Sequence, residues 1–241
     1  MQPTFNPWIG YFDLIAYVDE FIFFDTIQLN QQSWQTRNKL KIQSKELLFS
    51  IPILKDKSKK EILIKDAKIN FNKFDFRKKL SRTLEQNYKK ASYFNEVNYF
   101  IQELIMFDTE YLSEYNINII TKIVEKLEFK TKIITLSQTN YDSKFAKEEL
   151  VLDICKYFNT KNYISPLGSK DYLDKAIDIF KTSNIDIYYQ YYQHPVYQQI
   201  GDEFLPYIGI FDLLYNEGFE NSAKIIRSGR KYEKVEYNEN R

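Results

Sequence analysis

The chain begins with apolar residues at helical spacing and continues into a short, unbroken apolar run. The helical positions are Trp8, Ile9, Phe12, Ile15 and Ala16. Their spacing predicts a helix, and the apolar run at residues 21–24 is typical of a strand buried on both faces. Residues 47–53 predict a second strand, followed by a polar loop at residues 55–60.

The middle of the chain is predicted to be helical, and the C-terminal half alternates. Apolar residues recur at helical spacing over roughly residues 73–128. Strands are then predicted at residues 132–136, 163–165 and 185–192, and helices at residues 144–158 and 171–181. A last helix over residues 206–216 is expected to end near Gly218, because glycine commonly follows a helix C-terminus.

Strand–helix alternation at this spacing is typical of βαβ units with parallel strands. We therefore expect an α/β fold with a mostly parallel sheet flanked by helices, and a helical insertion or subdomain in the middle of the chain. The sequence suggests no internal repeat, no low-complexity tract and no linker rich in Pro, Gly or Ser. Residues 1–241 are accordingly predicted to form a single domain.

Charge and cysteine content narrow the classes of function. The 34 Lys and Arg residues balance 33 Asp and Glu residues, so no nucleic-acid partner is expected. One Cys and one His are too few for a zinc site of the usual Cys/His kind, and no metal site is predicted. A single Cys cannot form an intrachain disulfide, which fits a reducing cytoplasm.

Hydropathy gives no sign of a transmembrane or secreted protein. No stretch approaches about 18 uninterrupted apolar residues, and no basic region followed by an apolar run opens the chain. The 20 Tyr and 19 Phe residues reflect either coding bias or a surface on which sugars or bases stack. The sequence does not indicate an oligomeric state.

Several motifs along the chain resemble one protein family. The opening residues 1–12 read Met-Gln-Pro-Thr-Phe-Asn-Pro-Trp-Ile-Gly-Tyr-Phe. Later pieces are Trp-Gln-Thr-Arg-Asn-Lys at residues 34–39, Tyr-Ile-Ser at 163–165, His-Pro-Val-Tyr-Gln at 194–198 and Asp-Leu-Leu-Tyr-Asn-Glu-Gly at 212–218. In this order and spacing, they are similar to the WbqC-like protein family nearly from end to end.

The resemblance implies a bacterial protein from gene clusters for O-antigen, lipopolysaccharide or another surface polysaccharide. It implies a transferase that attaches a glycyl or other acyl group to an amino sugar, with a small-molecule or nucleotide-linked sugar as substrate. The alternative is a non-catalytic module that binds a sugar nucleotide or a partner within the polysaccharide pathway.

This chain departs from the family pattern at two positions. The family usually carries a short apolar strand before the Gln-Pro pair, whereas this chain starts at Met1, so the true start lies upstream or the strand is absent. The family also often has two acidic residues where this chain has Asp25-Thr26, which puts a metal role at that position in doubt.

Asp25 is the leading candidate for a catalytic residue. It directly follows the predicted strand at residues 21–24, and ligands of parallel sheets bind beyond the carboxyl ends of the strands. There it can act as a base or bind a metal, an amine or a ribose. The alternative is that Asp25 caps the following turn.

The loop expected after Asp25 carries further candidates for substrate binding, namely Gln28, Trp34, Arg37 and Asn38. An Arg side chain can hold a phosphate or carboxylate through two parallel hydrogen bonds. An Asn side chain adds a donor and an acceptor, and Trp34 offers a face for a sugar or base. Alternatively, Arg37 is a surface charge and Trp34 belongs to the core.

Gln2, Asn6 and Tyr11 surround a proline-containing turn into the first predicted helix and are also predicted to bind substrate. Helix N-termini attract anions. The arrangement is similar to the N-terminal signature of nucleotidyltransferase-like α/β enzymes, although the histidines that those enzymes use are absent. This fold-level analogy allows ATP and Mg²⁺ as cofactors but does not establish them.

Two more candidate regions lie in the C-terminal half. Ser165, Gly168 and Lys170 occupy a strand–loop–helix junction that either meets a phosphate or forms an ordinary turn. Their spacing is not that of a P-loop. His194 is the only histidine, so any imidazole catalysis depends on it, which makes it a second candidate catalytic residue. The alternative is a turn at the end of a strand.

Overall fold

The structure is a computed structural model of the chain and describes every residue except 31, 55–60, 73, 143–144 and 238–241. The predicted polar loop at residues 55–60 and the start of the helix predicted at 144–158 lie outside the described residues. The internal contacts divide the chain into two units. Unit 1 comprises residues 1–138 and 194–228, and unit 2 comprises residues 139–193 and 229–241.

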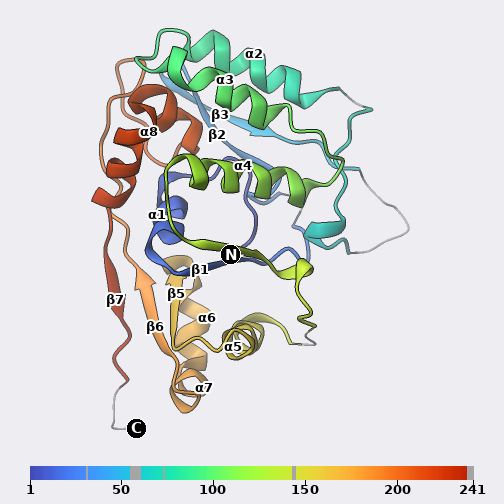
Figure 1. Cartoon of the computed structure of the whole chain (residues 1–241), viewed down its shortest axis with the longest axis vertical. Helices are drawn as coiled ribbons and strands as arrows, with labels where there is room; N and C mark the ends of the chain where they lie inside the picture. The colour runs from blue at the N-terminus through green and yellow to red at the C-terminus, as the bar shows by residue number, and fades with distance from the viewer. Residues whose placement is uncertain (31, 55–60, 73, 143–144, 238–241) are drawn as a thin grey trace. The chain divides into compact units, whose positions relative to one another are not determined.

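Unit 1 contains a parallel pair of strands, β1 (Glu20–Phe23) and β4 (Lys132–Thr135). The apolar run at residues 21–24 forms β1, with Phe21 and Phe23 buried. Along the other edge of β1, the Met1 amine donates to the Ile22 carbonyl at 2.8 Å, and the Phe24 N–H donates to the Met1 carbonyl at 2.7 Å. This is the parallel hydrogen-bonding pattern, so the segment at Met1 runs in the same direction as β1 and β4; Figure 1 marks the N-terminus beside β1.

An antiparallel hairpin in unit 1 corrects the expectation that Arg37 and Asn38 lie on a loop. Both residues begin β2 (Arg37–Ile42), which pairs with β3 (Lys45–Ser50) in the register Arg37 to Ser50. The strand prediction at residues 47–53 is therefore displaced toward the N-terminus. β2 has few apolar residues, and its backbone bonds to β3 give it a stability that its hydropathy does not indicate.

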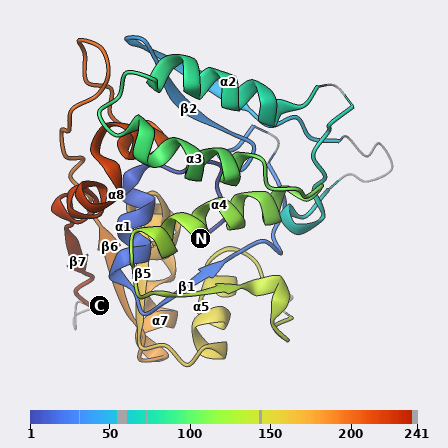
Figure 2. The ribbon, with the colours of Figure 1, turned by 45° about the horizontal axis from the view of Figure 1, so that its top comes forward.

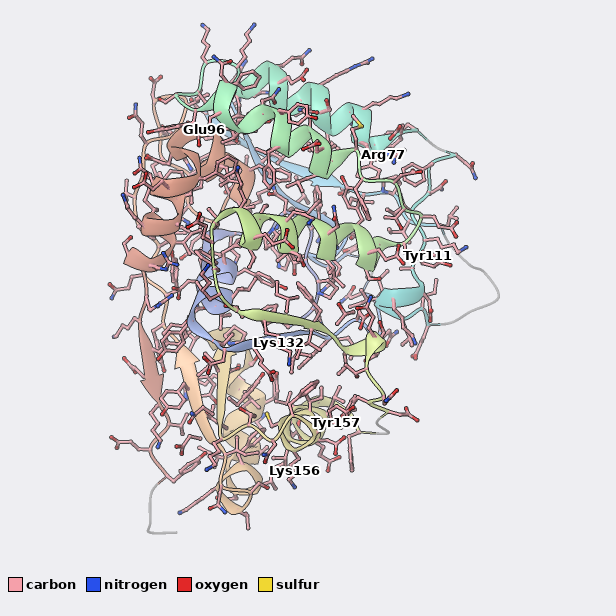
Figure 3. All side chains as sticks on the ribbon, in the orientation of Figure 1. Arg77, Glu96, Tyr111, Lys132, Lys156 and Tyr157 are labelled. Atoms are coloured by element: carbon pink, nitrogen blue, oxygen red, sulfur yellow. The ribbon has the colours of Figure 1, made fainter. Side chains whose placement is uncertain are left out.

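The predicted helical middle is confirmed as helices α2 (Phe76–Tyr88), α3 (Phe94–Ile105) and α4 (Leu112–Lys126). Helix α3 contacts both α2 and α4, and Figure 2 shows the three helices side by side. At the start of α2, the Asp75 carboxylate accepts the Arg77 N–H, and the Arg77 guanidinium also pairs with Asp108. Arg77 is labelled in Figure 3.

Two helices from opposite ends of the chain pack together in unit 1, α1 (Ile9–Tyr17) and α8 (Ile210–Ser228). Gly218 was expected to end the last helix. Instead it kinks α8, because its φ of 69° and ψ of −175° are not helical, and helix resumes after it. The short 3-10 helix η1 (Ile64–Asp66) contacts α4, and η2 (Leu136–Gln138) directly follows β4.

Unit 2 has its own sheet, in the order β5 (Asn162–Pro166), β6 (Asp186–Gln190) and β7 (Tyr232–Lys234). β5 and β6 are parallel, whereas β7, which the sequence did not predict, is antiparallel to β6. Its helices are α5 (Lys147–Tyr157), η3 (Leu167–Ser169), α6 (Lys170–Leu173), η4 (Asp174–Ala176) and α7 (Ile177–Thr182). The helix predicted at residues 171–181 is thus broken into short pieces.

The prediction of a mixed α/β fold is confirmed. The prediction of one mostly parallel sheet is too simple, because the described strands form three small sheets and only two of these contain a parallel pair. The single domain over residues 1–241 stays a prediction. Across the described residues, every helix is too short or too polar to cross a membrane.

Candidate functional site

The carboxyl ends of β1 and β4 bring Asp25 and Ser137 together. Asp25 follows β1, and Ser137 lies in η2 after β4. The Asp25 carboxylate accepts a hydrogen bond from the Ser137 backbone N–H at 3.0 Å and another from the Ser137 hydroxyl. Asp25 is only 2% exposed. It therefore caps the turn after β4, and not the turn that follows it in sequence.

Gln2 connects this edge to the start of β2. It follows Met1, which pairs with β1. The Gln2 side chain is hydrogen-bonded to the side chain of Gln35, and the Gln2 carbonyl accepts the Tyr11 hydroxyl at 2.7 Å. The predicted residues Gln2 and Tyr11 are thereby placed at the same strand edge as Asp25.

Arg37 and Trp34 are the predicted residues of this region with capacity for a ligand. Among the described residues, no hydrogen bond or ion pair involves the half-buried Arg37 guanidinium. The Trp34 side chain is 51% exposed, so Trp34 is not a core residue. Its carbonyl accepts the Phe5 N–H at 2.9 Å, which ties it to the N-terminal segment. Gln28 is exposed and pairs through its backbone with Leu63.

Asn6 and Asn38 are buried and bind backbone groups. Asn38 Nδ2 donates to the carbonyls of Phe5 and Asn6 at 2.8 and 2.9 Å. Asn6 Oδ1 accepts the Phe211 N–H at 3.2 Å and so caps the start of α8. Asn6 Nδ2 has no hydrogen-bond partner among the described residues, which is costly for a buried donor.

A second polar cluster, which the sequence did not indicate, surrounds Asp212 on α8. Asp212 is 1% exposed. Its Oδ1 accepts the Tyr88 hydroxyl at 2.7 Å, and its Oδ2 accepts the Tyr197 hydroxyl and Gln199 Nε2, both at 2.8 Å. Burial raises the pKa of Asp212 above its usual value, while these three hydrogen bonds oppose the shift.

Lys41 of β2 completes this cluster through Gln199. Lys41 Nζ donates to Gln199 Oε1 at 3.0 Å and to the Glu203 carbonyl. Gln199 also bonds both the N–H and the carbonyl of Leu205, which closes the loop between them. Burial lowers the pKa of Lys41, and the nearby Asp212 carboxylate opposes that shift. We call Lys41, Tyr88, Tyr197, Gln199 and Asp212 the Asp212 cluster.

His194 lies on the irregular loop of residues 194–208 and uses both ring nitrogens for backbone groups. Its Nε2 accepts the Tyr207 N–H at 3.1 Å, and its Nδ1 lies 2.9 Å from the Pro195 carbonyl. Since Nε2 is an acceptor, Nδ1 carries the proton and the ring is neutral. Burial lowers the pKa of His194, which favours the same state. The predicted catalytic role stays untested, and the geometry favours a positioning role.

One motif occurs twice, which corrects the expectation that the chain has no internal repeat. Residues 7–14 read Pro-Trp-Ile-Gly-Tyr-Phe-Asp-Leu, and residues 206–213 read Pro-Tyr-Ile-Gly-Ile-Phe-Asp-Leu. The first copy leads into α1 and the second into α8. The Asp of each copy, Asp13 or Asp212, is buried.

The two copies of the motif meet at their aromatic residues. The Ile210 N–H donates to the Pro7 carbonyl at 2.9 Å, and the rings of Trp8 and Tyr207 lie 5.2 Å apart at an angle of 61°. The glycines allow this approach: a Cβ at Gly10 would overlap the Trp8 indole, and a Cβ at Gly209 would overlap Asn6.

Tyr207 and Trp8 occupy matching positions but differ in conformation. Trp8 is extended, with φ of −72°, and half-buried. Tyr207 has φ of 61°, a left-handed conformation that costs a bulky residue about 1–2 kcal/mol. Its side chain nevertheless stays 52% exposed. Strain at an exposed aromatic residue is a reason to look for a functional role.

The three candidates of unit 2 lie together at the β5–α6 junction. Ser165 is buried, and its hydroxyl donates to the Pro166 carbonyl at 3.3 Å. Lys170 Nζ pairs with Asp174 at 2.6 Å and lies over the Tyr189 ring. A Cβ at Gly168 would meet nothing within 4 Å, so no close backbone approach within the described chain requires this glycine.

One feature of the sequence does indicate that Asp212 is buried. Asp212 stands inside the run Ile-Phe-Asp-Leu-Leu at residues 210–214, and an acid flanked by apolar residues on both sides has to be buried with the helix. Such an acid needs partners. The sequence does not name those partners, since Lys41, Tyr88 and Gln199 are distant along the chain.

Comparisons with known proteins agree with the motif-based resemblance. Residues 2–224 match the sequence model of the WbqC-like protein family. The chain is also similar to the uncharacterized protein Rv1507c of Mycobacterium tuberculosis, with 28% identity over 222 residues that cover 91% of this chain and 93% of that relative. No solved structure matches the chain significantly.

Proposed function

The chain belongs to the WbqC-like protein family, and on that basis we propose that it is a transferase that attaches a glycyl or other acyl group to an amino sugar. The product would enter the synthesis of O-antigen or another surface polysaccharide. A nucleotide-linked amino sugar of the cytoplasm is the acceptor class that this proposal requires.

The observation that carries the proposal is the spare capacity of Asp25 at the carboxyl edge of the parallel strands. A carboxylate can accept about four hydrogen bonds, and Ser137 supplies two of them. Ligands of parallel sheets bind beyond this edge. A carboxylate at this place is suited to take the proton of an attacking amine.

The reaction joins the sugar amine to an activated carboxyl group. The amine nitrogen forms a bond to the carbonyl carbon, and the bond between that carbon and its leaving group breaks. The leaving group departs with the electron pair, and the amine proton passes to the Asp25 carboxylate.

The activating reagent in this proposal is ATP. The Arg37 guanidinium is the candidate group for its phosphates, and the exposed Trp34 ring is the candidate face for its base. Among the residues that the structure describes, no group of three or more His, Cys, Asp or Glu could hold a metal ion. Mg²⁺ commonly binds through substrate phosphates and one or two carboxylates, and it would arrive with the nucleotide.

The test is to incubate the purified chain with ATP, Mg²⁺, glycine and a nucleotide-linked amino sugar. We expect AMP, pyrophosphate and a sugar whose mass has risen by one glycyl group. Asp25→Asn should remove the product. Asp19→Asn, which changes an exposed acid before β1, should leave it unchanged. Absence of product with every acyl donor tried contradicts the proposal.

The second candidate function is a non-catalytic module that binds a sugar nucleotide or a partner in the pathway. The capping bonds between Asp25 and Ser137 support it, since they give this carboxylate a structural role without catalysis. In that case Asp25→Asn would keep the pathway product in cells, whereas Trp34→Ala would lose it.

A further inference from the structure

The repeated motif places Trp8 and Tyr207 in contact where two helices begin. We propose that Tyr207, held in place by Trp8 and His194, forms the binding surface for the ring and ammonium group of an amino sugar. This inference rests on the proposed transferase function, because it assigns a place to the acceptor while Asp25 and Arg37 serve the chemistry and the donor.

The conformation of Tyr207 is the first argument for a ligand. Glycine or asparagine would take a left-handed backbone at lower cost, and an aromatic ring without a function would gain by burial. Tyr207 is an aromatic residue that has a left-handed backbone, with φ of 61°, and its ring is exposed. Trp8, at the matching position of the other copy, takes an ordinary backbone and is half-buried.

His194 and Trp8 fix the Tyr207 ring. The His194 ring stacks on Trp8 at 6.0 Å and meets Tyr207 at 5.1 Å edge to face. His194 also accepts the Tyr207 N–H. Because Nε2 is an acceptor, the imidazole is neutral and does not repel a cation. The Tyr197 ring contacts His194, and the Tyr197 hydroxyl donates a hydrogen bond to Asp212.

Charge favours a cationic ligand at this surface. Aromatic faces attract ammonium groups, and a tyrosine ring can carry the apolar face of a pyranose. The loop that carries Tyr207 also carries two exposed acids, Asp202 and Glu203. Both raise the pKa of Lys41, although burial lowers it overall. These two acids therefore favour the positively charged ammonium group of an amino sugar.

The experiment uses the two tryptophans of the chain as separate reporters. Trp34→Phe leaves Trp8 as the sole tryptophan, beside Tyr207. This variant is titrated with glucosamine, with N-acetylglucosamine and with glucose, and the Trp8 fluorescence is recorded. We expect saturable change with glucosamine and at least about tenfold weaker binding of the other two sugars, which lack the ammonium group.

Substitutions of Tyr207 in this background test the contact. Tyr207→Ala should weaken glucosamine binding about tenfold, whereas Tyr207→Phe, which keeps an aromatic ring and leaves Trp8 the sole tryptophan, should bind within about twofold of the parent. Should Tyr207→Ala fold poorly, Tyr207→Asn tolerates the left-handed backbone. It should melt no lower than the parent and still lose binding.

Three results would overturn the inference. They are an unchanged Trp8 signal with glucosamine, equal binding of glucosamine and N-acetylglucosamine, and undiminished binding by Tyr207→Asn.

Failure of the proposed transferase function gives different results. Trp8→Phe leaves Trp34 to report ATP binding, so a chain that binds glucosamine but neither binds ATP nor transfers glycine keeps the Tyr207 surface and loses the transferase proposal. Transfer without any Trp8 response would instead keep the transferase proposal and remove the Tyr207 surface.

Discussion

Asp25 and Asp212 are almost equally buried carboxylates of unit 1, at 2% and 1% exposed, but their partners differ. Within the described part of the chain, Asp25 receives two hydrogen bonds, both from Ser137. Asp212 receives three, from side chains of α2 and of the 194–208 loop. Burial alone therefore does not separate the carboxylate that we propose as a base from the one with a structural role. The number of its partners and the segments that supply them are more informative.

The largest expected effect is on catalysis at Asp25. An asparagine at position 25 can still accept the Ser137 N–H, so Asp25→Asn should change the free energy of unfolding by about 1 kcal/mol or less. Loss of the base should lower the transfer rate about 100- to 10,000-fold. Rates from product mass spectrometry and unfolding curves in urea provide both numbers. A variant that unfolds but retains its specific activity would reverse the roles of the two acids.

Asp212→Ala should act on stability. It removes the acceptor of three buried donors and the nearby carboxylate with the largest effect on Lys41, so we expect a loss of about 3–5 kcal/mol. Urea denaturation measures it. The control on the same helix is Glu220→Ala. The exposed Glu220 carboxylate pairs with Lys224, and little change is expected. Equal unfolding curves for the two variants would contradict the structural role of Asp212.

The contrast between Asp25 and Asp212 also shows what the sequence can predict. The position of Asp25 at a strand end is predictable, because an apolar run over a few consecutive residues indicates a buried strand and Asp25 directly follows that run. β2 was missed because its residues alternate weakly and its stability comes from pairing with β3. Arg37 and Asn38 were thus assigned to the wrong element, and their role in substrate binding stays a prediction.

The Asp212 cluster could not be assembled from the sequence. Its members stand at positions 41, 88, 197, 199 and 212, and only the folded chain joins them. The repeat can be recognised in the sequence, since both copies share Pro, Ile, Gly, Phe, Asp and Leu in order. The structural role of the repeat cannot be predicted from the sequence, because the left-handed backbone of Tyr207 and its contact with Trp8 depend on the packing of α1 against α8.

Two glycines give the next smaller test, which concerns the start of the helix that carries Asp212. Gly209→Ala forces a methyl group into Asn6, which caps α8, and should cost about 1–3 kcal/mol. Gly168→Ala in unit 2 meets open space and should be neutral or stabilising by up to about 1 kcal/mol. Thermal melts of both variants compare them directly. A neutral Gly209→Ala would mean that the start of α8 adjusts easily and does not hold Asp212 in place.

The smallest expected effect is the pH response of His194, which links the Asp212 cluster to Tyr207 through Tyr197. Burial depresses the pKa of His194 below its ordinary value of 6.5, so the folded chain disfavours its protonation. The stability that the neutral ring contributes is complete above that ordinary pKa and is lost as the pH falls below it.

The only histidine of the chain gives a single imidazole signal in an NMR titration. We expect a midpoint below 6.5, and glucosamine binding that weakens through the same pH range, because protonated Nε2 no longer accepts the Tyr207 N–H. His194→Gln should remove the pH dependence of binding. A midpoint at or above 6.5 would show that the ring is not held as a neutral acceptor, and would leave Tyr207 without the contact that fixes it.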